Sequence, residues 1–370
     1  MDAIDVRKLV RFHDNKLILE EVSLSAPAGA VTAVLGGRRS GKMTVLRCIA
    51  GVERTDSGHV TVGGRDVGDL KAGRRDVAMI FHNQALMPHL NVRENIAFPL
   101  KVTKVAKAEI ASRVEEVAAR FGLSDVLKKR PRALTENQCH HVSIARAVVR
   151  RPAAYLVEDA PAAASPELRD MIRLEVARLR SEDGATILFA TEEGAAAMAL
   201  ADRIVVLVDG RVVQSGDSQA VYCRPRNLGV AGLLGPPTLN RFAAKVVSCA
   251  GDTVRLKLRG GTTVSAKVRT DELGEGERVT LGIWPAHLRC GKAGELHATV
   301  SAITGAGEHK VLELESRAGA CSAIVGCDEI VDVGDETWVQ LPPENCLVFD
   351  DSGAAMTPPV GPEGKTRACD

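Results

Sequence analysis

The chain has 370 residues, with 48 Lys and Arg against 47 Asp and Glu. This near-balance disfavours a nucleic-acid-coating protein or a polybasic membrane binder, both of which normally carry a surplus of positive charge. Hydrophobic residues make up 45% of the chain and aromatic residues only 3%, so we expect a core of Ala, Val, Leu and Ile and no segment that crosses a membrane.

The first 83 residues predict strands around one turn and one helix. Residues 1–30 resemble short strands, and the apolar segment 31–35 is typical of a buried strand of a parallel sheet. A glycine-containing turn follows this strand and leads into a segment with helical spacing. Residues 57–83 are again strand-like, with turn residues between them.

The next part of the chain alternates helices with strands. Residues from about 86 to 150 have helical periodicity, and a second buried strand ends at Glu158. A helix beginning near residue 166, the strand ATILFA, a helix from about 193 to 201 and a hairpin with a DG turn follow. This alternation predicts an α/β fold with a doubly wound parallel sheet.

From about residue 240, short strands are separated by Gly and Asp turns, which predicts an all-β, barrel-like second domain. Residues 351–370 are rich in Pro, Gly and polar residues and predict a flexible tail. The nine cysteines are scattered and include no CxxC pair, so we expect neither a zinc site nor a disulfide framework.

The turn after residue 35 has the spacing of a phosphate-binding loop: Gly36, four residues, Gly41 and then Lys42. In such a loop backbone N–H groups hold the phosphates and the lysine reaches the terminal ones. A hydroxyl residue that holds Mg²⁺ normally follows the lysine. Here Met43 stands at that position, and Thr44 lies about 100° further around the helix.

The flanking sequence resembles the ATP-binding subunits of ABC importers, of the carbohydrate-uptake kind that serves maltose and glycerol-3-phosphate. The resemblance covers roughly residues 3–350 and rests on the segments LRCIAGVERTDSGHVTVGGRDV, ALMPHLNVRENIAFPL, ARAVVRRP, ADRIVVLVDGRVVQSG, VYCRPRN, LGIWPAHL and LPPENCLVF. It implies a P-loop, ABC-type nucleotide-binding domain over residues 1–235 with a helical subdomain at about 86–139. It also implies an OB-like regulatory domain over residues 236–350, before the tail at 351–370.

The same resemblance implies cofactors, partners and location. In that family two chains sandwich two ATP molecules, with Mg²⁺, and drive membrane-embedded subunits. We therefore expect a homodimer that contacts membrane subunits through the helical region, and no nucleic-acid partner. The expected location is the cytoplasm, or the inner face of the cell membrane as a peripheral protein.

At almost every position where the family places a chemical group, this chain has a different residue. The replaced positions are the Mg²⁺ ligand (Met43), the γ-phosphate-sensing glutamine (His82), the Walker B aspartate (Glu158), the catalytic glutamate (Asp159) and the switch histidine (Glu192). The Ser-Gly-Gly-Gln signature is altered as well: it reads Thr135, Glu136, Asn137, Gln138, and only its final glutamine is kept. An adenine-stacking aromatic residue remains, either Phe12 or His13. Arg38 and Arg39 stand where small residues are usual.

Several of these residues also have a purely structural interpretation. Thr135 and Gln138 form a capping-box pattern, with Glu136 in the first helical turn, and we favour this interpretation over a new phosphate contact. His82 is expected to be a solvated loop residue, and Lys42 could line a simple anion-binding turn. His140 and His141 occupy adjacent helix positions that face different directions, which disfavours a metal pair. Trp284 and Ala286 replace the Arg and Glu common in the second domain.

The replacements predict slow hydrolysis. A shift of about 1 Å in a catalytic group costs about a hundredfold in rate, and loss of a base costs about 10²–10⁴. Glu136 and Glu192 would each repel the γ-phosphate by about 3 kcal/mol at an effective dielectric near 20. We therefore expect a folded, non-hydrolysing relative of an importer ATPase. The alternatives are a working ATPase subunit and a heterodimer member, and the latter gains little because both halves of the site are altered.

Overall fold

The structure is a computed structural model that describes residues 2–81, 86–161, 163–235, 237–269, 273–306 and 309–356. The chain divides into two units, Met1–Ser218 and Gln219–Asp370. Each unit has its own hydrophobic core. Among the described helices, none is long and apolar enough to cross a bilayer.

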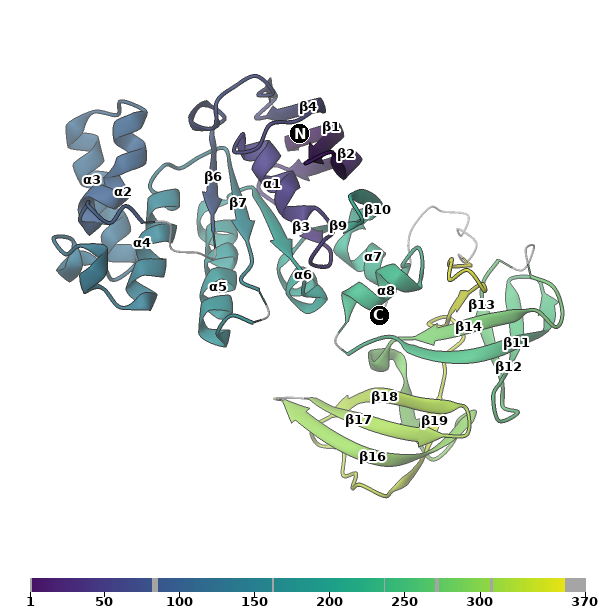
Figure 1. Cartoon of the computed structure of the whole chain (residues 1–370). Coiled ribbons are helices and arrows are strands. Elements are labelled where there is room, and N and C mark those ends of the chain that lie inside the picture. Colours follow the sequence, from purple (N-terminus) through teal and green to yellow (C-terminus); the bar gives the residue numbers. More distant parts are fainter. Residues whose placement is uncertain are drawn as a thin grey trace. The chain divides into compact units, whose positions relative to one another are not determined.

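A six-stranded sheet forms the centre of the first unit (Figure 1). Its strands, in order across the sheet, are β10 (Arg211–Asp217), β9 (Arg203–Val208), β3 (Val31–Leu35), β8 (Ile187–Thr191), β7 (Ala154–Glu158) and β6 (Val77–Ile80). All neighbouring pairs are parallel except β9 and β10, which form the hairpin predicted from the DG turn. The predicted α/β fold with a doubly wound sheet is confirmed.

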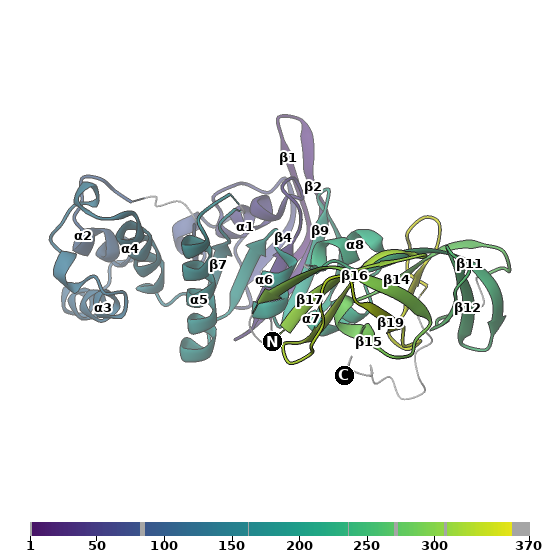
Figure 2. The same cartoon turned by 90° about the horizontal axis from the view of Figure 1, so that it is seen from below.

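A second, antiparallel sheet of the first unit has the strand order β2-β1-β4-β5. Its strands are β1 (Asp2–His13), β2 (Lys16–Pro27), β4 (Ser57–Val62) and β5 (Arg65–Asp66). The segment predicted as short strands is thus a hairpin of two 12-residue strands (Figure 2). Several irregularities interrupt its register.

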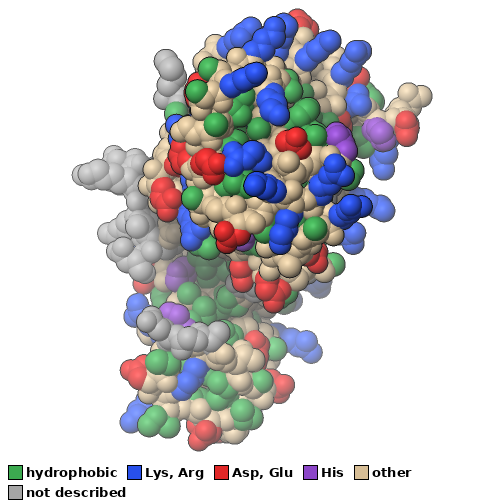
Figure 3. Space-filling model, turned by 90° about the vertical axis from the view of Figure 1, so that its left-hand side faces the viewer, with side chains coloured by type: hydrophobic (Ala, Val, Ile, Leu, Met, Phe, Trp, Pro, Cys, Tyr) green, Lys and Arg blue, Asp and Glu red, His purple; other side chains and the backbone are tan. Residues whose placement is uncertain are grey.

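Helices pack beside and between these sheets. They are α1 (Lys42–Ala50), α2 (Val92–Val102), α3 (Lys107–Arg120), α4 (Glu136–Val148), α5 (Pro166–Asp183) and α6 (Gly194–Leu200), with single 3₁₀ turns at Ala72–Arg74, Ser124–Val126 and Pro131–Ala133. The helices α2, α3 and α4 pack on one another. Figure 3 faces this helical part of the chain, where ten Lys and Arg stand against six Asp and Glu between residues 86 and 139.

The first unit also buries an acidic side chain away from the glycine-rich turn. Glu175 on α5 is only 5% exposed, and Arg120 lies 3.0 Å from its carboxylate. Arg120 also contacts Asp183 at 2.9 Å and Glu182 at 3.8 Å. Burial raises the pKa of Glu175 from 4.5 to about 7, although the Arg120 charge acts in the opposite direction.

The second unit begins with two helices, α7 (Ser218–Cys223) and α8 (Leu228–Leu234), which the sequence assigned to the first domain. The rest is all-β, as predicted, and forms two five-stranded antiparallel sheets. One contains β13 (Thr263–Lys267), β12 (Thr253–Leu258), β11 (Asn240–Ala250), β14 (Arg278–Ile283) and β20 (Leu347–Phe349). The other contains β15 (Arg289–Gly291), β19 (Glu336–Gln340), β16 (Leu296–Ala306), β17 (His309–Ser316) and β18 (Gly319–Gly326).

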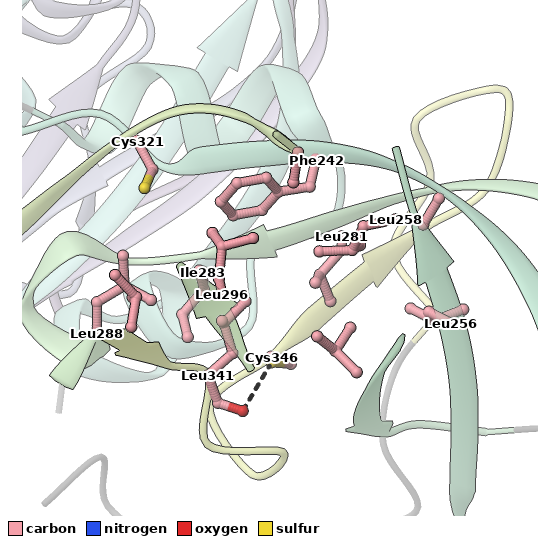
Figure 4. Packing of buried hydrophobic residues seen from close by; sticks show 14 of the residues in the cluster. Phe242, Leu256, Leu258, Leu281, Ile283, Leu288, Leu296, Cys321, Leu341 and Cys346 are labelled. Atoms are coloured by element: carbon pink, nitrogen blue, oxygen red, sulfur yellow. Dashed lines mark hydrogen bonds between the residues drawn. The ribbon is translucent and has the colours of Figure 1, made fainter. Parts of the chain in front are cut away.

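Both sheets of the second unit contribute to one core. Phe242, Leu281 and Ile283 from the first of these sheets pack with Leu296 and Cys321 from the second (Figure 4). Alternating buried and exposed residues along β11 and β12 explain why these segments form strands with one face in the core.

Two details of the second unit bear on the sequence predictions. The side chain of Trp284 is buried, stacks on Tyr222 at a ring distance of 4.3 Å and donates its indole N–H to the Tyr222 carbonyl. It therefore has a packing role in this position. In the predicted tail, Met356 is 8% exposed and packs against the core, while residues 357–370 lie outside the described residues.

Candidate functional site

The predicted phosphate-binding loop lies between β3 and α1, at the carboxyl edge of the parallel sheet. Gly41 has a φ of +92°, a left-handed conformation that favours glycine, and a Cβ there would lie 2.7 Å from Leu19. Ser40 and Lys42 are buried, whereas Arg38 and Arg39 are exposed. The loop therefore turns sharply and directs the lysine, rather than the two arginines, inward.

The Lys42 side chain already has two partners. Its Nζ donates to the Gly37 carbonyl at 3.0 Å and forms an ion pair with the Glu192 carboxylate, also at 3.0 Å. The Lys42 side chain is 8% exposed and that of Glu192 is 35% exposed. The sequence placed Glu192 at the switch-histidine position, and the structure brings it directly to the lysine.

The order of the strands in the sheet explains why Glu192 lies next to Lys42. Leu35 pairs with Thr191, and the Gly36 N–H donates to the Thr191 carbonyl at 3.2 Å. Asp159, one residue beyond β7, donates its N–H to the Ala190 carbonyl. Since parallel strands end at the same edge, the loop, Asp159 and Glu192 lie close together although they are far apart in sequence.

Asp159 is held in a network that the sequence did not predict. Its Oδ2 accepts hydrogen bonds from the Thr191 hydroxyl at 2.7 Å and from Arg173 at 2.8 Å. The Asp159 side chain is 3% exposed, and its buried Oδ1 has no hydrogen-bond partner among the described residues. One oxygen of the carboxylate is thus fixed and the other is still able to accept a hydrogen bond.

Two arginines on α5 tie this network to Glu193. Arg169 donates to one Glu193 oxygen at 2.8 Å, and Arg173 lies 2.9 Å from the other. Burial raises the pKa of Glu193, but the hydrogen bonds and charges of the two arginines outweigh it and leave that pKa below its usual value. The sequence shows two arginines four positions apart and, about twenty residues later, two consecutive glutamates, but no spacing between them predicts that they meet.

The remaining predicted site residues have varied surroundings. The Met43 side chain packs against the core of the first unit. Outside this set, Ser165 caps the start of α5, and its hydroxyl accepts the Leu168 N–H at 3.3 Å. Glu158 and Thr44 are half-buried. His82 lies outside the described residues.

The predicted capping box at the start of α4 is confirmed. The Gln138 N–H donates to the Thr135 hydroxyl at 3.2 Å, and the Thr135 N–H donates to the Gln138 side chain at 3.0 Å. Glu136, in the first turn, is 82% exposed and lies 3.8 Å from the buried His140. His141 instead packs near Phe121, so the two histidines have different surroundings.

The two candidate adenine-stacking residues are both exposed near the end of β1. Phe12 is 45% exposed, and its N–H donates to Asp56 at 2.7 Å. His13 lies 3.5 Å from Asp14. Either ring is accessible from solvent.

Comparisons with known proteins agree with this geometry. The family model described as ABC transporter matches residues 19–162. The chain is 36% identical over 351 residues to the sn-glycerol-3-phosphate import ATP-binding protein UgpC 2 of Agrobacterium fabrum, covering 95% of this chain and 93% of that protein. This chain belongs to the family of ABC importer ATP-binding subunits.

Other members of the ABC importer family match over a similar length. The maltose/maltodextrin import ATP-binding protein MalK of Vibrio vulnificus is 31% identical, over 96% of this chain and 97% of its own. The lactose transport ATP-binding protein LacK of Rhizobium radiobacter is 35% identical, over 91% and 94%. The solved structure of cbiO1 from Clostridium perfringens has a TM-score of 0.52 and 22% identity, and it covers 60% of this chain and 90% of its own. That likeness supports the fold.

The family implies ATP and Mg²⁺, and the residues at the site fit the two groups unequally. The sharp turn and the first N–H groups of α1 suit phosphate oxygens. Mg²⁺ is a hard cation that takes oxygen ligands. The position after Lys42 instead carries a thioether that packs into the core. The site therefore fits the nucleotide phosphates better than it fits the metal.

Proposed function

We propose that this chain is an importer subunit that keeps the nucleotide-binding fold but hydrolyses ATP slowly or not at all. The observation that carries the proposal is the Lys42–Glu192 ion pair at 3.0 Å. The terminal phosphate would have to displace this carboxylate or lie beside it. Two such charges about 4 Å apart repel by about 4 kcal/mol at an effective dielectric near 20, and by less where solvent reaches Glu192.

The surroundings of Asp159 support the same proposal. A general base must accept a proton from the attacking water. The Arg173 guanidinium, 2.8 Å from Oδ2, and the Thr191 hydroxyl, 2.7 Å from the same oxygen, occupy one of the two oxygens that could accept this proton. Asp159 is also one methylene shorter than the glutamate usual in this family. Together these features favour a slow chemical step.

A working ATP-hydrolysing subunit, energising import of a sugar or a glycerol-phosphate-like solute, is the second candidate. It is favoured by the near-full-length similarity to import ATP-binding proteins. It is also favoured by the buried Oδ1 of Asp159, which is a suitable acceptor for a water molecule. The two candidates differ in the rate of turnover.

Steady-state ATPase activity of the purified chain with Mg²⁺ distinguishes them. The comparison is a variant that combines Met43→Ser, Glu136→Gly, Glu158→Asp, Asp159→Glu and Glu192→His. We expect the unmodified chain to turn over well below about 1 s⁻¹, the lower end for ordinary enzymes, and the combined variant to be faster. Turnover of the unmodified chain at about 1 s⁻¹ or above would support the second candidate. Titration with a fluorescent ATP analogue, with Lys42→Ala as control, measures binding separately.

We also propose that two copies of the chain assemble at the inner face of the cell membrane, with membrane-embedded subunits contacting the helical segment at about residues 86–139. A groove of about 590 Å³ between α2 and α3 supports this contact. Its lining includes Ala97, Val105, Ile110 and Val114 beside Lys101 and Lys107. Apolar side chains rimmed by charges are typical of docking surfaces.

Co-purification with co-expressed membrane subunits tests this contact. Ala111 is exposed and lines the groove, whereas its neighbour Ser112 is exposed and does not line it. We expect Ala111→Glu to abolish co-purification and Ser112→Glu to preserve it. Equal behaviour of the two variants would argue against the groove. The second unit is proposed to be regulatory, as the resemblance implies.

A further inference from the structure

Three positively charged side chains stand side by side on one sheet of the second unit. Lys245 on the central strand β11 pairs directly with Lys257 on β12 and with Arg278 on β14. All three residues are exposed, while their neighbours Ala244, Val246 and Leu256 are buried in the core. Because side chains alternate along a strand, the three cations occupy the outer face of the sheet.

A row of like charges destabilises the sheet that carries it. Like charges directly opposite one another on neighbouring strands destabilise a sheet, because their Cβ atoms are only about 5 Å apart. Within the described part of the chain, none of Lys245, Lys257 and Arg278 forms an ion pair within 4.0 Å. Among the described side chains, no close ion pair therefore offsets the repulsion within the row.

The row borders a cavity. A hollow of about 730 Å³ is lined by Lys245, Lys257, Arg259 and Arg278, and the acidic side chain in the lining is Asp351. Between the cations lie residues with small side chains or none: Ala243, Thr280, Gly260 and Gly261. Ala243 pairs with Thr280 on one side, and its carbonyl accepts the Arg259 N–H on the other. The small residues leave open space in a hollow that four cations line.

We infer that this cavity binds a small, multiply charged phosphate compound. Phosphate oxygens accept hydrogen bonds from Lys and Arg, and a compact ligand with two or more negative charges can contact several of the four cations at once. The concave shape of the site favours a compact molecule over an extended acidic chain. Bound phosphate would also relieve the repulsion along the row.

Calorimetric titration with inorganic pyrophosphate tests this inference. The full-length chain carries Lys42→Ala, which removes the cation of the glycine-rich turn in the first unit. Binding that remains at the backbone N–H groups of that turn is told apart by the second-unit variants below, because it would not respond to them. No divalent metal is added. We expect one saturable binding event at 0.15 M salt, with inorganic phosphate binding more weakly because it reaches fewer cations.

Matched variants then locate the binding. Lys245→Gln combined with Arg278→Gln should weaken pyrophosphate binding by about a hundredfold, since each of the two lost charge-assisted hydrogen bonds costs about a factor of ten. Arg255→Gln is the control: Arg255 is exposed on the same face of β12, two residues from Lys257, and does not line the cavity. It should change the affinity by less than about twofold. Circular dichroism checks that each variant is folded.

Three results would overturn the inference. The first is the absence of saturable pyrophosphate binding up to millimolar concentration. The second is an equal loss in Arg255→Gln, which would indicate only diffuse attraction to positive charge. The third is tighter binding of a short polyglutamate peptide than of pyrophosphate, which would make the site one for an acidic peptide.

Discussion

The ammonium group of Lys42 lies 3.0 Å from the carboxylate of Glu192, a residue 150 positions later in the chain. The same nitrogen donates to the carbonyl of Gly37 inside its own loop. The two contacts fix the lysine across the turn that would hold the terminal phosphates. A nucleotide must therefore compete with a carboxylate for the cation that normally attracts it.

Removing that competing charge should strengthen nucleotide binding. Glu192→Gln keeps the size of the side chain but removes its negative charge. We expect the affinity for a fluorescent ATP analogue to rise by about tenfold, equivalent to about 1.4 kcal/mol. Glu182→Gln, an exposed position on α5, is the control and should leave the affinity unchanged. Equal affinities for Glu192→Gln and the unmodified chain would show that the ion pair opens at no cost.

Arg173 should be essential for the stability of the first unit. Arg173→Met leaves the buried Asp159 with only the Thr191 hydroxyl, and we expect a loss of about 3 kcal/mol in the free energy of unfolding by urea. Arg169→Met should cost less than about 1 kcal/mol, because Glu193 keeps its contact with Arg173. Combining Arg173→Met with Asp159→Asn should recover part of the loss, since no unpaired charge remains. No recovery would point to packing instead.

Glu175 should make the stability of the first unit depend on pH. Its folded-state pKa of about 7 lies above the ordinary value of 4.5, so the folded state binds a proton that the unfolded state releases. The resulting stability is fully present below about pH 4.5 and is lost as pH rises to about 7, by up to about 3 kcal/mol.

Glu175→Gln removes this titration. We expect its free energy of unfolding to be higher than that of the unmodified chain at pH 8 and similar at pH 5. Glu182→Gln alters an exposed acid near the same Arg120 and should retain the original pH dependence. If both variants follow the same curve, the Arg120 ion pair keeps Glu175 charged throughout.

The cationic row of the second unit should be a source of instability. Lys245→Gln removes the central charge between Lys257 and Arg278. We expect the second unit to gain about 0.2–1 kcal/mol in low salt, and the gain to shrink as salt screens the repulsion. Thermal unfolding at two salt concentrations measures this. A salt-independent loss of stability would mean that the Lys245 stem packs on the sheet.

The features that the sequence predicted correctly are those formed by residues close together in the chain. The capping box of Thr135 and Gln138 involves residues three positions apart, so its pattern was sufficient to place the start of α4. The strand that ends at Glu158 and the turn from Gly36 to Lys42 were identified for the same reason. In each case the partners are close in sequence.

Partners distant in sequence were not predicted. Glu192 was recognised as a replaced position, but its contact with Lys42 depends on β3 and β8 being neighbours in the sheet. The Asp159–Arg173 pair depends on how α5 packs, which no spacing in the sequence specifies. Likewise, alternation indicates that Lys245 faces outward, whereas the register between strands decides that other cations flank it.

The stacking of Trp284 on Tyr222 places a fluorescent probe in the core of the second unit. The chain has only two tryptophans, Trp284 and Trp338, and both belong to the second unit. Trp284 is buried while Trp338 is 41% exposed. Tryptophan fluorescence, excited selectively over Tyr155 of the first unit, therefore reports on the second unit alone. A shift of its emission maximum during denaturation can be read separately from the loss of helical signal, which comes mainly from the first unit.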